Sequence, residues 1–101
     1  MSVTGILRTI DIDNLPDTKL TSMKRKQLYM RLNNVSVEIQ QNTIIAIILV
    51  YASEHDGYNA RVDQLPYDMV VDNTVIAFDV SNLPGRLQRI LTRVSDLIAT
   101  E

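Results

Sequence analysis

The clearest pattern of apolar and polar positions lies in residues 84–99, where apolar residues recur three and four positions apart. This spacing is typical of one buried face of an α-helix. The stripe consists of Leu87, Ile90, Leu91, Val94, Leu97 and Ile98. Pro84 suits the first position of a helix, where its missing N–H would have no partner. The pattern therefore predicts a helix over residues 84–99.

Two further segments are predicted to be helices. Residues 35–54 contain a continuous apolar run, 44–52, and no turn residue interrupts them, which favours a buried helix over a strand. Ile45, Ile48 and Leu49 are expected in its core-facing part. Residues 17–33 show a weaker stripe. The candidate caps are Ser36 and the turn Asp56-Gly57 for the central helix, and Asp17, Thr18, Thr21 or Ser22 for the first one.

Strands are predicted in two places. In residues 3–12, Ile6, Ile10 and Ile12 all stand at even-numbered positions, so their side chains would share one face of a strand. β-branched residues dominate this segment, which also favours a strand. Residues 60–80 indicate two or three short strands, with Asp72-Asn73 at a tight hairpin. Residues 66–71 are alternatively one helical turn after Pro66. An unpaired strand edge is sticky, so we expect residues 4–12 to pair with 74–80 or with the same element of a second chain.

A phrase ending in Leu-Pro occurs three times, as IDIDNLP (10–16), RVDQLP (61–66) and FDVSNLP (78–84). Each leucine is expected to fold back onto the core while the proline fixes the backbone angle of the next element. The chain is thus predicted to be one α+β domain over residues 1–101, with three main helices and a small antiparallel sheet of two or three short strands. Residues 1–15 form an N-terminal strand or arm, and 16–101 a helical core that includes the strand segment 60–80.

The composition narrows the class of protein. The absence of cysteine fits a reducing, intracellular compartment. A net charge of −2 argues against general affinity for nucleic acid. The longest apolar run, 44–52, is about half of the roughly 20 residues that a membrane-spanning helix needs. We therefore expect neither nucleic acid nor a membrane as the partner.

The charges are separated along the chain. Residues 19–31 hold five basic residues and no acid, whereas 62–79 hold four acids and no base. Arg86, Arg89 and Arg93 follow on the last predicted helix and are expected to be exposed charges, suited to binding a partner.

No constellation of catalytic residues is visible. His55 is the single histidine, and its neighbours Glu54 and Asp56 would point in different directions from a helix end. No glycine-rich loop precedes a helix, and no serine lies in a nucleophile-elbow context. We therefore expect no enzymatic activity, no catalytic residue, no metal ligand and no cofactor.

Residues 75–98, VIAFDVSNLPGRLQRILTRVSDLI, resemble the extraterminal (NET) domain of bromodomain-family and related transcription co-regulators. KRKQLYMRLNNVSVEIQQNTIIAIIL, residues 24–49, resembles the first two helices of that domain. The resemblance implies a nuclear role in transcription regulation and binding of a basic, apolar peptide as an added strand. Val75 and Ala77 stand where the family has acids, leaving Asp79 and Asp72.

We therefore expect a protein-interaction module that binds a partner strand beside residues 74–80 by β-augmentation. The expected partner-binding residues are Val75, Ala77, Asp79, Asp72, Arg86, Arg89 and Arg93. One alternative is a small homo-oligomeric structural or assembly protein, including one of viral origin, that associates through a sheet edge. A second alternative is an accessory factor that binds nucleic acid.

Overall fold

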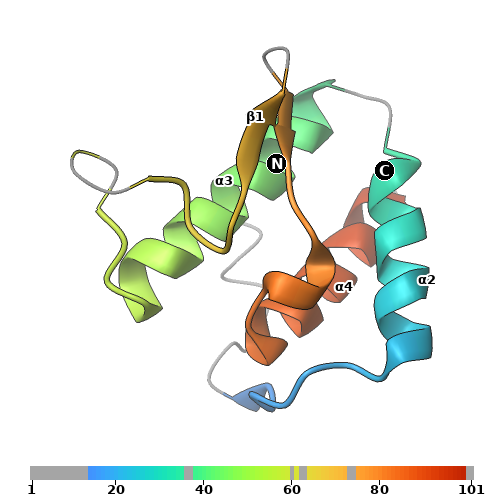
Figure 1. The fold of residues 1–101 in the computed structure, drawn as a ribbon. Helices are drawn as coiled ribbons and strands as arrows, with labels where there is room; N and C mark the ends of the chain where they lie inside the picture. The colour runs from blue at the N-terminus through green and yellow to red at the C-terminus, as the bar shows by residue number, and fades with distance from the viewer. Residues whose placement is uncertain (1–13, 36–37, 60, 62–63, 73–74, 100–101) are drawn as a thin grey trace.

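The structure is a computed structural model that describes residues 14–35, 38–59, 61, 64–72 and 75–99. Its elements are three α-helices, a two-stranded antiparallel sheet and a 3₁₀ turn, which confirms the predicted small α+β fold (Figure 1). In chain order they are α2 (Ser22–Asn33), α3 (Glu38–His55), β1 (Val70–Asp72), β2 (Val75–Ala77), η2 (Val80–Asn82) and α4 (Gly85–Ala99). The predicted strand 3–12 and the predicted cap Ser36 lie outside the described residues.

The first helix begins later than position 17, the start of the predicted range, because Thr21 is its N-cap. The Thr21 hydroxyl accepts a hydrogen bond from the Lys24 backbone N–H at 3.3 Å. This bond satisfies one of the N–H groups that the first helical turn leaves without a partner. Residues 14–20, here named the leading segment, therefore precede α2 as irregular chain.

The other two helices follow the predicted ranges closely. Helix α3 ends at His55, and Gly57 follows with a φ of +70°, which glycine adopts without a steric penalty. Helix α4 begins at Gly85, and the Pro84 carbonyl accepts the hydrogen bond of the Gln88 N–H at 3.0 Å. Pro84 thus lies one position before the helix rather than at its first position.

The predicted hairpin is present, but its register differs from the one that a turn at Asp72-Asn73 would give, because Asp72 is the last residue of β1. Val70 pairs with Ala77, Val71 with Ile76, and Asp72 with Val75. Before it, the backbone turns at residues 66–69, where the Met69 N–H donates to the Pro66 carbonyl at 3.2 Å. Tyr67 and Asp68 have positive φ angles of 58°, so this turn is not the right-handed helical turn considered as the alternative for residues 66–71.

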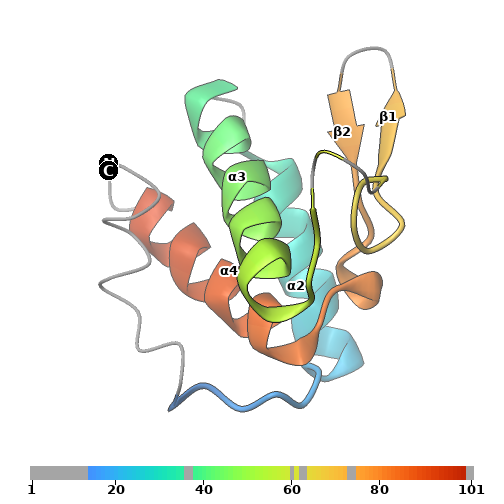
Figure 2. The ribbon, with the colours of Figure 1, turned by 90° about the vertical axis from the view of Figure 1, so that its left-hand side faces the viewer.

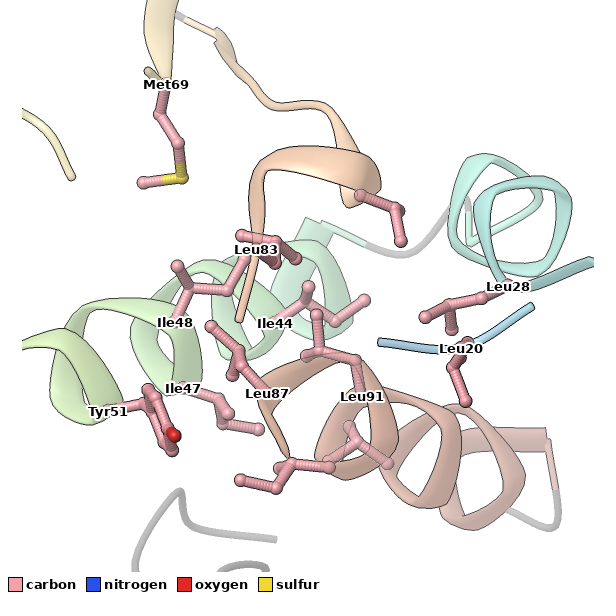
Figure 3. Packing of buried hydrophobic residues seen from close by; sticks show 13 residues of the cluster. Leu20, Leu28, Ile44, Ile47, Ile48, Tyr51, Met69, Leu83, Leu87 and Leu91 are labelled. Atoms are coloured by element: carbon pink, nitrogen blue, oxygen red, sulfur yellow. The ribbon is translucent and has the colours of Figure 1, made fainter. Parts of the chain in front are cut away.

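The core lies where α3 and α4 face each other, and α2 closes one side (Figures 2 and 3). The hairpin stands to one side of the three helices (Figure 2). Ile48 is fully buried as predicted, but Ile45 and Leu49 are only partly buried at the edge of the core. The fully buried aliphatic residues facing each other from the two helices are Ile47, Ile48, Leu87, Ile90, Leu91 and Val94.

The leucines of the three Leu-Pro phrases all contact this core. Leu83 is fully buried, and Leu15 and Leu65 are partly buried against the core cluster. The predicted role of these leucines is therefore confirmed. They attach irregular chain to the helices, because burying a leucine side chain stabilises the folded state by roughly 1.5–3 kcal/mol.

Candidate protein-interaction site

A groove of about 690 Å³ lies between the hairpin and the helices. Tyr29 and Leu32 of α2, Ile45 of α3, and Ile76 and Phe78 at β2 line it. Its walls are mainly apolar, with amide side chains at its rim. The volume lies within the range of about 300–1,000 Å³ that is usual for ligand sites. We name it the β2 groove.

The β2 groove runs along the edge of β2 and not only across one face of the hairpin. Successive side chains of a strand point to opposite faces, so a groove on one face would contact alternate residues. Ile76 and Ala77 are consecutive residues of β2, yet both line the groove, and so does Phe78 directly after the strand. The sheet order β1–β2 leaves this edge of β2 without a strand neighbour among the described residues, and β2 is the strand nearer the helices in Figure 2.

The predicted residues of the hairpin region differ in their placement. Ala77 is exposed and lines the β2 groove. Val75 lies opposite Asp72 in the hairpin register, and the side chains of these two residues are outside the described part of the structure. Asp79 is exposed, and its carboxylate accepts the Ser81 backbone N–H at 2.9 Å, which caps the turn η2. Asp79 therefore has a local structural role next to the groove.

The three predicted arginines are not equivalent. Arg86 donates from Nε to the Leu15 carbonyl at 3.2 Å, and Arg89 donates from Nε to the Thr18 carbonyl at 3.3 Å. Both side chains are half-buried, whereas Arg93 is exposed. The expectation of three exposed charges is therefore wrong for Arg86 and Arg89. Both arginines hold the leading segment through these hydrogen bonds. The one ion pair between described residues is Arg31–Asp96, so neither arginine is paired with an acid of 62–79.

Gln88 has a structural role that the sequence pattern did not predict. It is fully buried, and its Oε1 accepts the Leu20 backbone N–H at 3.0 Å. Its Nε2 donates to the Val80 carbonyl at 2.8 Å and to the Leu83 carbonyl at 3.0 Å. One side chain thus joins the leading segment, η2 and α4. The available signal was a polar residue beside the apolar stripe of a helix, which also fits an exposed position.

Gly85 allows the leading segment to cross the start of α4. A Cβ atom at this position would lie 2.3 Å from the Thr18 carbonyl carbon and 2.4 Å from the Asp17 oxygen. Backbone atoms cannot give way as a flexible side chain can. The absence of a side chain at Gly85 is therefore required by a contact between residues far apart in the sequence.

Tyr67 joins the turn before β1 to the chain that follows α3. The Tyr67 hydroxyl donates a hydrogen bond to the Asp56 carboxylate. Burial raises the pKa of Tyr67, and the hydrogen bond to Asp56 raises it further. Burial also raises the pKa of Tyr51, although the neighbouring Arg86 guanidinium acts in the opposite direction. The Tyr51 ring lies 4.4 Å from that of His55.

The described residues contain neither a metal-ligand cluster nor a helix that could span a membrane. Within the described ranges, no three histidine, cysteine or acidic side chains come together as a metal-binding group. No helix in that part of the chain combines the length and the apolar character needed to cross a bilayer.

The chain matches no protein-family model, and neither the curated proteins nor the solved structures contain a significant match.

Proposed function

We propose that this protein is a non-enzymatic interaction module that binds an extended segment of a partner protein along the edge of β2. In this mode the partner adds a strand to the hairpin. Its main-chain hydrogen bonds supply affinity, and alternate side chains enter the groove. The observation that carries the proposal is the contact of the β2 groove with Ile76 and Ala77, two consecutive residues of β2, and with Phe78 directly after them.

The groove favours a partner segment whose alternate residues are apolar. Ile44 and Ile45 of α3 and Tyr29 of α2 lie across it from β2. Tyr29 is 49% exposed, so an incoming side chain can cover its ring. Such coverage is favourable because aromatic rings contribute large apolar areas to interfaces.

The order of two helices, a hairpin and a last helix supports relating the domain to the extraterminal family that it resembles. In that family the added strand is basic because the receiving strand is acidic. Here β2 has the sequence Val75–Ala77 without an acid. We therefore propose that apolar side chains select the partner more strongly than basic ones. A nuclear location and a role in transcription regulation belong to the same proposal.

The test begins with extended peptides selected on the protein from a random display library. Binding is then measured with two tryptophan variants of exposed α3 residues. Asn42 lines the β2 groove, whereas Ser53 lies three turns away on the same helix and outside it. We expect N42W to weaken binding at least about tenfold, a loss of 1.4 kcal/mol, and S53W to leave it unchanged.

Amide hydrogen exchange supplies the second measurement. Strand addition should slow exchange at residues 75–78, because a backbone N–H facing the open edge acquires an acceptor. Equal affinities for N42W and S53W, with no change of exchange in β2, would refute β-augmentation. Protection on β1 alone would show that the opposite edge of the hairpin is the binding edge.

Self-association through β1 is the second candidate function. Val70 and Val71 are 57% and 65% exposed, although their side chains point to opposite faces of the strand. An exposed apolar edge strand is a template for pairing with another chain. Sedimentation equilibrium of the full chain and of V71K tests this candidate. A dimer that the lysine substitution dissociates would support it, and a monomer at all concentrations would exclude it.

A further inference from the structure

A second groove, of about 280 Å³, separates α2 from α4. Its apolar surface consists of the half-buried Leu15 and of Leu20 and Leu28, which lie at its floor and are 7% and 2% exposed. It lies on a different face of α2 from the β2 groove. Lys24, Leu28 and Arg31 recur at the spacing of one helix face, and the α2 residues of the β2 groove belong to another. We name it the basic groove.

Among the described residues, four cations and no acid line the basic groove. Lys24 and Arg31 come from α2, and Arg89 and Arg93 come from α4. Like charges gathered around a small apolar depression repel one another, and the repulsion increases where water is excluded. A ligand carrying negative charge would relieve this repulsion.

Two of the four cations are already engaged. Arg31 forms an ion pair with Asp96 at 2.8 Å, and Arg89 donates to the carbonyl and the hydroxyl of Thr18. The side chains of Lys24 and Arg93 form no hydrogen bond or ion pair with a described residue. Both are exposed, one on each wall of the groove. They are therefore the two cations available to a ligand.

We propose that the basic groove binds an acidic segment of a partner protein, with one apolar side chain on the leucine surface and carboxylates beside Lys24 and Arg93. This inference goes beyond strand addition at β2 and does not depend on it. The apolar surface favours a peptide over a nucleic acid, because none of the described residues that line the groove is aromatic and could stack with a base. The small volume fits one anchoring side chain.

The test uses a fluorescent, acetylated peptide in which pairs of aspartate or glutamate alternate with single leucines. Binding to the full-length chain is followed by fluorescence anisotropy, and the site is mapped by amide chemical shifts. We expect the largest shifts at Lys24, Leu28 and Arg93, and weaker binding at higher salt because exposed charge pairs are screened. Replacing the leucines of the peptide by glycine should abolish binding.

The decisive comparison uses two double charge reversals. K24E/R93E removes the two available cations of the basic groove. K26E/R61E makes the same change in net charge at exposed residues that do not line this groove. Each lost surface pair is worth up to about fivefold in affinity, so we expect K24E/R93E to weaken binding about tenfold or more. K26E/R61E should change it less than about threefold.

Three outcomes would overturn the proposal. Equal losses in the two double variants would show that only net charge matters. Shifts confined to residues outside the basic groove would place the peptide elsewhere. Tighter binding of a single-stranded oligothymidine at the same residues would make the groove a nucleic-acid interface. Thermal melting of both variants checks their folding, which substitution of exposed side chains should leave intact.

Discussion

Replacing Gln88 by leucine should disrupt the junction on which both grooves depend. The substitution keeps a side chain of similar size but removes three buried hydrogen bonds. It leaves the Leu20 N–H and the Leu83 carbonyl without that partner, whereas the Val80 carbonyl keeps its hydrogen bond from the Leu83 N–H at 3.1 Å. Each buried polar group left unpaired costs about 1–3 kcal/mol. The two groups sum to about 2–6 kcal/mol, and the buried leucine side chain offsets part of this loss, so the expected destabilisation is about 2–5 kcal/mol.

This loss is large compared with the roughly 5–15 kcal/mol that stabilises a typical domain. Urea denaturation followed by circular dichroism measures it, and native-state amide exchange at Leu20 reports the local effect. Q27L is the matched control, because Gln27 is an exposed glutamine on α2, and its free energy of unfolding should change by no more than about 0.5 kcal/mol.

Q88E refines the same experiment. The carboxylate would face two carbonyl oxygens in the core, and burial with these acceptors raises its pKa in the folded state. Its protonated form can donate to one of the carbonyls. A raised folded-state pKa means that stability is retained below the unfolded pKa of about 4.3 and lost as the pH rises through the folded value. A cost below about 1 kcal/mol for Q88L, or no pH dependence for Q88E, would refute the role assigned to Gln88.

Four further predictions concern stability. I48A should cost about 2–5 kcal/mol in urea denaturation, because Ile48 is fully buried between helices; a cost below 1 kcal/mol would contradict the packing. G85A should destabilise the protein by about 1–3 kcal/mol, because the added methyl group would overlap the backbone of the leading segment. At an open helix position the same substitution would be stabilising. A higher melting temperature for G85A would therefore refute the close contact between Gly85 and the leading segment. R89Q should lower the free energy of unfolding by about 1–3 kcal/mol, because the Arg89 guanidinium donates to the Thr18 carbonyl. R93Q should lower it by less than about 0.5 kcal/mol, because Arg93 is exposed. Equal effects of the two substitutions would contradict this difference. The difference in free energy of unfolding between the native chain and Y67F should be constant below pH 10 and should decline above it. The reason is that the tyrosine of the unfolded chain ionises near pH 10, whereas burial keeps Tyr67 of the folded chain protonated. A constant difference up to pH 11 would exclude the raised pKa.

Local patterns in the sequence determined the elements. The regular stripe of residues 84–99 and the apolar run 44–52 predicted α4 and the buried part of α3, because helix periodicity and length are recorded in neighbouring residues. Asp72-Asn73 predicted the hairpin, because turn chemistry is also local, but not its register, in which Asp72 pairs with Val75 inside the sheet. The inward role of the Leu-Pro leucines followed from the same kind of argument.

The tertiary structure alone decided which of these elements meet. Arg86, Arg89 and Arg93 form one series in the sequence, yet two of them hold the leading segment and one faces solvent. Gln88 has a partner 68 positions away, and Gly85 is required by backbone that precedes α2. The two grooves likewise combine side chains from distant segments. A stripe of apolar residues records only that a helix face is buried, because hydrophobic burial is non-directional. The identity of the covering segment is set by packing and by hydrogen bonds that form only after the chain has folded.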